Sequence, residues 1–150
     1  MNGTMAVAFI KGLQGGNPKY WRAAPLLKQF LANSHEDHRN VSSSNFDERV
    51  FWEYYSVPFR MGFLESGAKA VMASYNAWNG TAMAVNPILR SVVIDKWGVD
   101  VIPSDAGAVR LVNPRLVTSL PVETGIGLAR LRQRIRDFVQ CLHGNAHAPR

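Results

Sequence analysis

The sequence predicts an α/β fold of about three β/α units around a parallel sheet. Short apolar runs, typical of buried strands, occur at 26–31, 70–75 and 99–102. A helix-compatible stretch separates each run from the next, and this alternation favours parallel strands. Polar residues follow the second and third runs, at 74–76 and 104–105. Since chemistry in such folds gathers where strands end, we expect these two polar groups to meet.

The chain before and including the first strand is predicted to form a short helix, a loop and a strand. Residues 2–13 are compatible with a short helix, and the Gly-Gly-Asn-Pro sequence that ends the segment 14–18 predicts a loop. In the strand at 26–31, Lys28 and Gln29 form a polar pair inside an apolar run. A polar loop is expected to follow this strand.

A long helix is predicted between the first and second strands. Apolar and aromatic side chains recur at helical spacing over 46–64, and Asn45 with Glu48 three residues later suits a capped start. Pro58 should kink this helix or split it in two. The aromatic residues of 51–59 are expected to pack on the sheet rather than to form a ligand-stacking platform.

The remainder predicts one more β/α unit and a tail. Pro87 suits a first helical turn, and its helix should reach about Lys96, before the strand at 99–102. Further on, 126–142 is typical of a basic amphipathic helix. Three units cannot close an eight-stranded barrel, so the chain is either a small open sheet or part of a larger barrel.

Composition is that of one domain with a real core. The chain has 150 residues, of which 47% are hydrophobic, and this length is enough to bury a core. The single cysteine, Cys141, excludes an internal disulfide. No run has the length of a membrane span, and the apolar run 5–10 is too short for a signal peptide. The cellular compartment is left open.

Charge is distributed unevenly. Residues 1–105 hold 10 Lys and Arg against 9 Asp and Glu, whereas 106–150 hold 7 Arg against two acids, which gives +1 and +5 of the total +6. The basic end could bind nucleic acid or an anionic membrane, but a solvated helix face is the preferred interpretation, so neither partner is expected. Residues 35–38 contain metal-ligand types, yet without further ligands at defined spacing no metal is expected.

Five segments resemble glycoside hydrolase family 3, and their order and spacing match as well. They are 27–34 (LKQFLANS), 46–49 (FDER), 57–60 (VPFR), 71–80 (VMASYNAWNG) and 97–105 (WGVDVIPSD). The resemblance implies part of a (β/α)8 barrel, the fold of the family's catalytic domain, over residues 1–112. It leaves 113–150 as a divergent arginine-rich tail. It also implies a β-glucosidase or β-xylosidase type of activity with no cofactor.

The resemblance also implies a set of site residues. Asp105 matches the family's nucleophile, and a retaining glycosidase needs such a carboxylate to attack the anomeric carbon. Lys28 and Gln29 match a Lys-His pair that hydrogen-bonds sugar hydroxyls. Tyr75 would flank the nucleophile. Arg60, in the VPFR segment, and Asn76, in the VMASYNAWNG segment, are further expected substrate-binding residues.

This chain departs from the family pattern in several places. Gln29 stands where the family has histidine, and glutamine cannot carry a positive charge. Ala106 follows the nucleophile where many members have tryptophan. A Gly-Arg-Asp-Pro-Arg type segment and the acid/base residue are missing from the sequence.

These departures favour a truncated and inactive piece of a longer enzyme, completed by the missing barrel half or a second domain. A non-catalytic carbohydrate-binding or interaction remnant is the alternative. Among the aromatic residues, Trp78 has the best prospects of touching substrate, because it follows a strand end.

Overall fold

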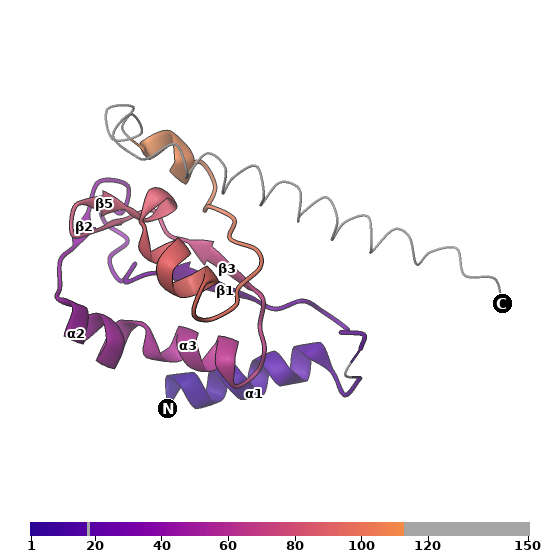
Figure 1. Ribbon diagram of the computed structural model, residues 1–150. Coiled ribbons are helices and arrows are strands. Elements are labelled where there is room, and N and C mark those ends of the chain that lie inside the picture. The colour runs from indigo at the N-terminus through magenta and orange to yellow at the C-terminus, as the bar shows by residue number, and fades with distance from the viewer. Residues whose placement is uncertain (18, 113–150) are drawn as a thin grey trace. The chain divides into compact units, whose positions relative to one another are not determined.

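A computed structural model describes residues 1–17 and 19–112, which belong to one compact unit, Met1–Asn113. The chain is a mixed α/β structure (Figure 1). Strand β1 (Leu26–Phe30) pairs in parallel with β3 (Ala70–Ala73). The predicted parallel pairing of the first two strands is therefore confirmed. The tail and its predicted helix at 126–142 lie outside the described residues.

Helix α1 (Asn2–Gln14) precedes the sheet and packs on α3 (Val57–Leu64), as Figure 1 shows. The two helices approach closely at Gly62, where an added Cβ would lie 2.7 Å from Leu27 Cδ2 and 3.2 Å from Ile10 Cδ1. Gly62 is thus the point at which α1, α3 and β1 meet. The helix expected at 2–13 is confirmed.

The long helix predicted for 46–64 consists of three successive segments, which are α2 (Glu48–Val50), a π-helical turn η1 (Phe51–Tyr55) and α3. Pro58 lies in the first turn of α3, where its missing N–H removes no helical hydrogen bond. The N-cap prediction was wrong by two residues. Asp47 accepts a hydrogen bond from the Val50 N–H at 2.8 Å, whereas Asn45 bonds to the Ser43 hydroxyl at 2.6 Å.

A second, small sheet was not predicted. It has the order β2 (Ser43–Ser44), β4 (Ala77–Trp78), β5 (Thr81–Ala82), with β2 and β4 parallel and β4 and β5 antiparallel. Asn79 and Gly80 form the turn between β4 and β5, both with positive φ. Strands of two residues are too short to show the alternation that identifies a strand in a sequence.

The third strand, predicted at 99–102, is reduced to two isolated parallel bridges. Val101 pairs with Ala70, and Ser104 pairs with Ala73. The Val71 N–H donates to the Val101 carbonyl at 3.0 Å, and the Asp105 N–H donates to the Ala73 carbonyl at 3.0 Å. The segment thus runs beside β3 in the expected direction, which carries Asp105 to the end of β3.

Three short helical turns complete the described chain. They are a 3-10 turn η2 (Met83–Val85), a π-helical segment η3 (Leu89–Ile94) and a 3-10 turn η4 (Ala108–Leu111). The helix predicted for 87–96 is present as η3 and its flanking turns. Gly107, with φ 78°, lets the chain turn into η4 directly after the strand-end segment.

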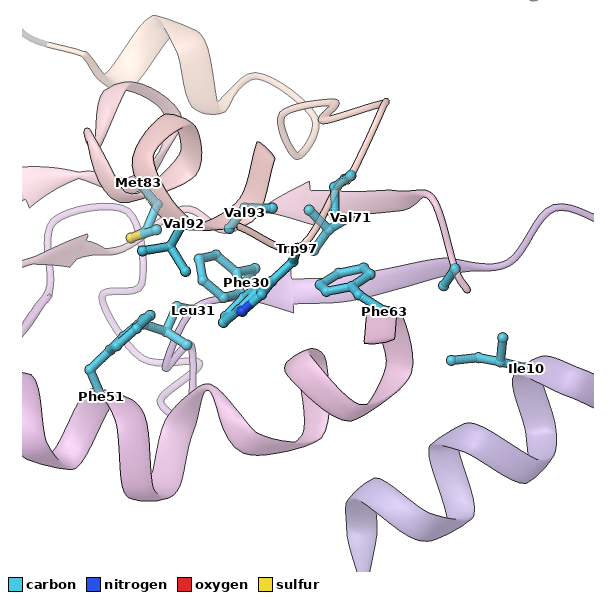
Figure 2. Close-up of a cluster of buried hydrophobic side chains, with 12 residues drawn as sticks. Ile10, Phe30, Leu31, Phe51, Phe63, Val71, Met83, Val92, Val93 and Trp97 are labelled. Carbon is cyan, nitrogen blue, oxygen red and sulfur yellow. The ribbon is translucent and has the colours of Figure 1, made fainter. Parts of the chain in front are cut away.

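The core is aromatic and lies between the sheet and the helices. Figure 2 shows Phe30, Phe63 and Trp97 side by side, and Phe30 meets Trp97 edge to face at 6.1 Å between ring centroids. Phe51 is fully buried and stacks on Trp97 at 6.3 Å. By contrast, Tyr54 is 70% exposed. The prediction that the 51–59 aromatics serve packing is confirmed for Phe51.

No helix among residues 1–17 and 19–112 is long and apolar enough to cross a membrane. In the same described part of the chain, no group of three or more His, Cys, Asp or Glu side chains is placed to hold a metal ion.

Candidate active site at the strand ends

Three parallel segments bring the candidate residues together at one edge of the sheet. Gln29 lies near the end of β1, Tyr75 follows β3, and Asp105 follows the segment that bridges to β3. Because the segments run in the same direction, their ends share one edge. The segments that carry 74–76 and 104–105 lie side by side, since Ala73 bridges to Ser104 and the Tyr75 hydroxyl donates to the Ala106 carbonyl.

The carboxylate of Asp105 is held from two sides. Its Oδ1 accepts a hydrogen bond from the Ala106 N–H at 2.8 Å, and its Oδ2 accepts one from Gln29 Nε2. Asp105 remains half-buried. The carboxylate therefore has a fixed plane and still reaches the surface of this chain.

Gln29 is itself held by a neighbour. Its Oε1 accepts a hydrogen bond from Asn33 Nδ2, so both ends of the Gln29 amide are engaged. Lys28, the other member of the predicted pair, is exposed on the same strand. Asn33 was not predicted as a site residue, although it lies in the family-like segment 27–34.

Tyr75 forms a second side of the site. Its hydroxyl donates to the Ala106 carbonyl at 2.5 Å, which ties β3 to the chain just after Asp105. The guanidinium of Arg39 lies over the Tyr75 ring, 4.6 Å from its centroid, and also bonds to Glu36 at 2.5 Å. Sequence reasoning missed Arg39, because its neighbours at 35–38 suggested a solvated loop.

Asn76 has a place different from the one expected of a substrate ligand. Its side chain is buried, with 1% of the residue exposed. Its Nδ2 donates to the Leu31 carbonyl at 3.1 Å and to Ser44 Oγ at 3.3 Å, and its Oδ1 accepts from Ser74 Oγ at 2.7 Å. Asn76 therefore joins the end of β1 to β2 and β3.

The structure does not gather every expected residue. Arg60 is exposed on α3, a helix that packs against α1, and lies on a different element from the strand ends. Trp78 is part of β4 and stacks against Phe46 at 5.4 Å and Phe51 at 5.1 Å. The expected contact of Trp78 with substrate stays a prediction.

A pocket of about 420 Å³ is lined by residues of 32–37 and 42–55, and neither Gln29 nor Asp105 is among them. Asn33 forms part of its wall, which links the pocket to the Gln29 amide. Its lining is part polar and part apolar. The polar lining residues are Asn33, Ser34, His35, Asp37, Ser42, Ser43, Ser44 and Asn45.

An α/β chain with a positioned carboxylate at the ends of its parallel strands has the arrangement in which such folds place active sites. Comparison with known proteins agrees with it. The family model described as "Glycosyl hydrolase family 3 N terminal domain" matches residues 1–129. The chain therefore belongs to glycosyl hydrolase family 3. The match continues past residue 112, the predicted end of the barrel part.

Individual relatives agree with the family. A β-glucosidase of Rhizobium radiobacter is 42% identical over 102 residues, which cover 67% of this chain and 12% of that protein. The exo-1,4-β-xylosidase bxlB of Emericella nidulans is 33% identical over 113 residues, covering 69% of this chain and 15% of that protein. The chain thus spans only 12–15% of the length of the curated relatives it matches first.

Solved structures show the same relationship. A family 3 exo-β-xylosidase, XlnD, in complex with a xylobiose aziridine activity-based probe, has a TM-score of 0.71 and 26% identity, covering 77% of this chain and 16% of that chain. β-Glucosidase 3B from Thermotoga neapolitana, in complex with glucose, has a TM-score of 0.61 and 31% identity, covering 69% of this chain and 14% of that chain.

Proposed function

We propose that this chain is part of the catalytic domain of a retaining β-glycosidase, with Asp105 as the nucleophile. The observation that carries the proposal is the half-buried Asp105 carboxylate, held at the strand ends by Gln29 and the Ala106 N–H. The names of the relatives support a β-linked glucoside or xyloside as the substrate. No cofactor is required for this chemistry.

The reaction would be a double displacement. The Asp105 carboxylate attacks the anomeric carbon, the glycosidic bond breaks, and a covalent glycosyl-enzyme forms that water then hydrolyses. A second carboxyl group, about 5–5.5 Å from the first, protonates the departing oxygen. We place this acid in the remainder of the protein, since the chain spans 12–15% of its first relatives.

The proposed substrate contacts surround Asp105. Lys28 is exposed at the strand end and can donate to sugar hydroxyls. Gln29 contacts the nucleophile directly, and Tyr75 with its stacked Arg39 borders the opposite side. The structure adds Arg39 to the residues proposed from the sequence.

Two of the residues proposed from the sequence have less direct roles. Asn76 would act through the backbone of Leu31 and the hydroxyl of Ser44, which its buried amide holds in place. Arg60 is kept as a proposed substrate contact on family position alone. An Arg60→Lys exchange in an active assembly would raise KM if that contact exists.

We also propose that residues 1–112 are about three units of a larger (β/α)8 barrel, followed by a divergent tail. The support is α1, whose exposed face carries Met5 (66% exposed), Phe9 (70%) and Leu13 (37%) at a spacing of four residues. A helix that leads into a parallel strand normally follows another strand. The remaining β/α units of the catalytic domain would cover this face.

The decisive experiment is hydrolysis of chromogenic β-glucoside and β-xyloside by the chain, alone and mixed with a barrel remainder. The remainder is the Rhizobium radiobacter β-glucosidase lacking its matching 102-residue segment. Asp105→Asn should reduce turnover by about a thousandfold or more, because the nucleophile is lost. Asp95→Asn, an exposed carboxylate on another element, is the matched control. Turnover that is equal in Asp105→Asn and wild type would overturn the assignment.

A non-catalytic carbohydrate-binding remnant is the second candidate. The observation in its favour is Gln29, whose amide is engaged at both ends by Asp105 and Asn33. In that case calorimetry would detect sugar binding by the chain, and the mixture with the barrel remainder would show no turnover. A mixture that turns substrate over through Asp105 would exclude this candidate.

A further inference from the structure

An oriented row of side-chain amides leads to the proposed nucleophile. Asn33 Nδ2 donates to Gln29 Oε1, and Gln29 Nε2 donates to Asp105 Oδ2. We propose that Asn33 is a positioning residue, which fixes the direction of the Gln29 amide so that its N–H rather than its oxygen faces Asp105. This inference rests on the proposed function only in naming Asp105 as the nucleophile.

The direction of the row follows from the acceptor-only chemistry of a carboxylate. An ionised Asp105 can accept but not donate, so a favourable contact requires the N–H side of Gln29. That orientation turns the Gln29 oxygen toward Asn33, which must then present its own N–H. A primary amide has nearly the same shape in both orientations, so the neighbours decide which one is adopted.

The hydrogen bond from Asn33 fixes the orientation of the Gln29 amide, which nothing in glutamine itself determines. When a sugar or water competes for the Gln29 amide, an unconstrained side chain could rotate and present its oxygen to the carboxylate. Bonding of the Gln29 oxygen to Asn33 disfavours that rotation. With Ala106 N–H on Oδ1 at 2.8 Å, both carboxylate oxygens then have a fixed donor.

The far end of the row marks its direction. Asn33 Oδ1 is buried and has no hydrogen-bond partner in the described part of the chain. The reverse orientation of both amides would give that position an N–H but would set the Gln29 oxygen against Asp105. The observed orientation leaves one neutral oxygen, that of Asn33, without a donor. The reverse orientation would leave an oxygen of the charged Asp105 carboxylate without a donor, and that costs more free energy.

The test is an exchange that keeps the shape of Asn33 but removes its donor. In Asn33→Asp, the new carboxylate competes for Gln29 Nε2 and turns the Gln29 oxygen toward Asp105. Asn40→Asp adds the same charge at an exposed position of the same loop and is the matched control. The measurement is NMR of the chain with ¹⁵N-labelled side-chain amides, in which a contact between Gln29 Nε2 and Asp105 gives a shifted and exchange-protected signal.

We expect this Gln29 signal in wild type, and its shift should vanish in Asp105→Ala. It should be lost in Asn33→Asp and retained in Asn40→Asp. The Ala106 backbone signal, whose N–H donates to Asp105 Oδ1, should move in Asn33→Asp and stay in place in Asn40→Asp. An unchanged Gln29 signal in a folded Asn33→Asp chain would overturn the proposal. If that variant does not fold, Asn33→Ala replaces it, and a retained Gln29 signal there is equally contradictory.

A second readout separates this inference from the proposed function. Labelling of Asp105 by a xylobiose aziridine probe, followed by intact mass, reports the nucleophile itself. In the assembled mixture Asn33→Asp should label about tenfold more slowly, with Asn40→Asp within about twofold of wild type. Absence of labelling in wild type would count against Asp105 as nucleophile, and the NMR result would still decide the role of Asn33.

Discussion

The strand ends of this chain and the α1 face that carries Met5 and Phe9 differ in how far their side chains are buried and paired. At the strand ends, Asn76 is 1% exposed and bonds to three neighbouring elements, and Asp105 is held by two donors. On α1, Phe9 and Met5 are 70% and 66% exposed. The polar side chains at the strand ends are paired within the described residues, whereas α1 leaves apolar surface uncovered.

This difference indicates how the chain relates to the larger proteins it resembles. The polar residues at the strand ends are held by hydrogen bonds from several segments of the described chain. The helix layer differs, because a stripe of large apolar side chains costs free energy while it faces water. The comparison predicts that changes at the strand ends alter folding, whereas changes on the α1 face alter association.

The largest effect is expected at Phe51, under the strand-end side. Its ring is fully buried and contacts Trp52, Trp78 and Trp97. Phe51→Ala should lower the free energy of unfolding by about 3–5 kcal/mol, because it leaves a cavity that these rings cannot fill. Urea denaturation followed by tryptophan fluorescence measures it. Tyr54→Ala, on the exposed side, should change it by less than about 0.5 kcal/mol.

Asn76 is expected to show the next largest effect. Asn76→Asp keeps the shape but removes the Nδ2 donor and places a carboxylate against the Leu31 and Ala77 carbonyls. Unfolding free energy should fall by about 3 kcal/mol, because a buried acceptor then faces acceptors. Asn40→Asp is the exposed control, again measured in urea. Equal stability of the two variants would mean that Asn76 does not organise the strand ends.

Two glycine substitutions test the contact between α1 and α3, at Gly62 and, as a comparison, at Gly12. Gly62→Ala should destabilise the chain by about 1–3 kcal/mol, because its Cβ would lie 2.7 Å from Leu27 Cδ2. Gly12→Ala, on α1 with no atom within 4 Å of the new Cβ, should stabilise it by about 0.5–1 kcal/mol. Thermal denaturation of both variants compares them. The same sign in both would contradict the close approach of α1 and α3.

The smallest effect on stability is expected at the α1 face itself. The double change Met5→Lys and Phe9→Lys should alter the unfolding free energy by less than about 0.5 kcal/mol. It should also lower self-association in sedimentation velocity, because it removes exposed apolar surface. Thr4→Lys with Ala8→Lys adds the same charge at exposed positions and is the control. If both pairs behave alike, charge rather than the apolar stripe governs association.

The sequence predicted Asp105 and its direct neighbour Gln29 as candidate site residues, but not the residues that contact Gln29 and Tyr75 in turn. Asp105 and Gln29 were identified from family motifs, and the structure brings them into contact. Asn33 and Arg39 were missed, because they belong to a polar loop whose residues show no periodicity. Such a loop acquires meaning only when tertiary contacts bring it beside β1 and Tyr75.

By itself, the sequence determined the α/β class, the helix–strand order and the parallel direction of β1 and β3. These follow from apolar runs, turn residues and one proline, all of which act over a few neighbouring residues. Contacts between distant segments decided that the predicted third strand would be reduced to bridges at Val101 and Ser104, that Asn76 would be buried, and that the Gln29 amide would face Asp105. Each depends on groups brought together from distant parts of the chain, and burial sets the strength of their hydrogen bonds.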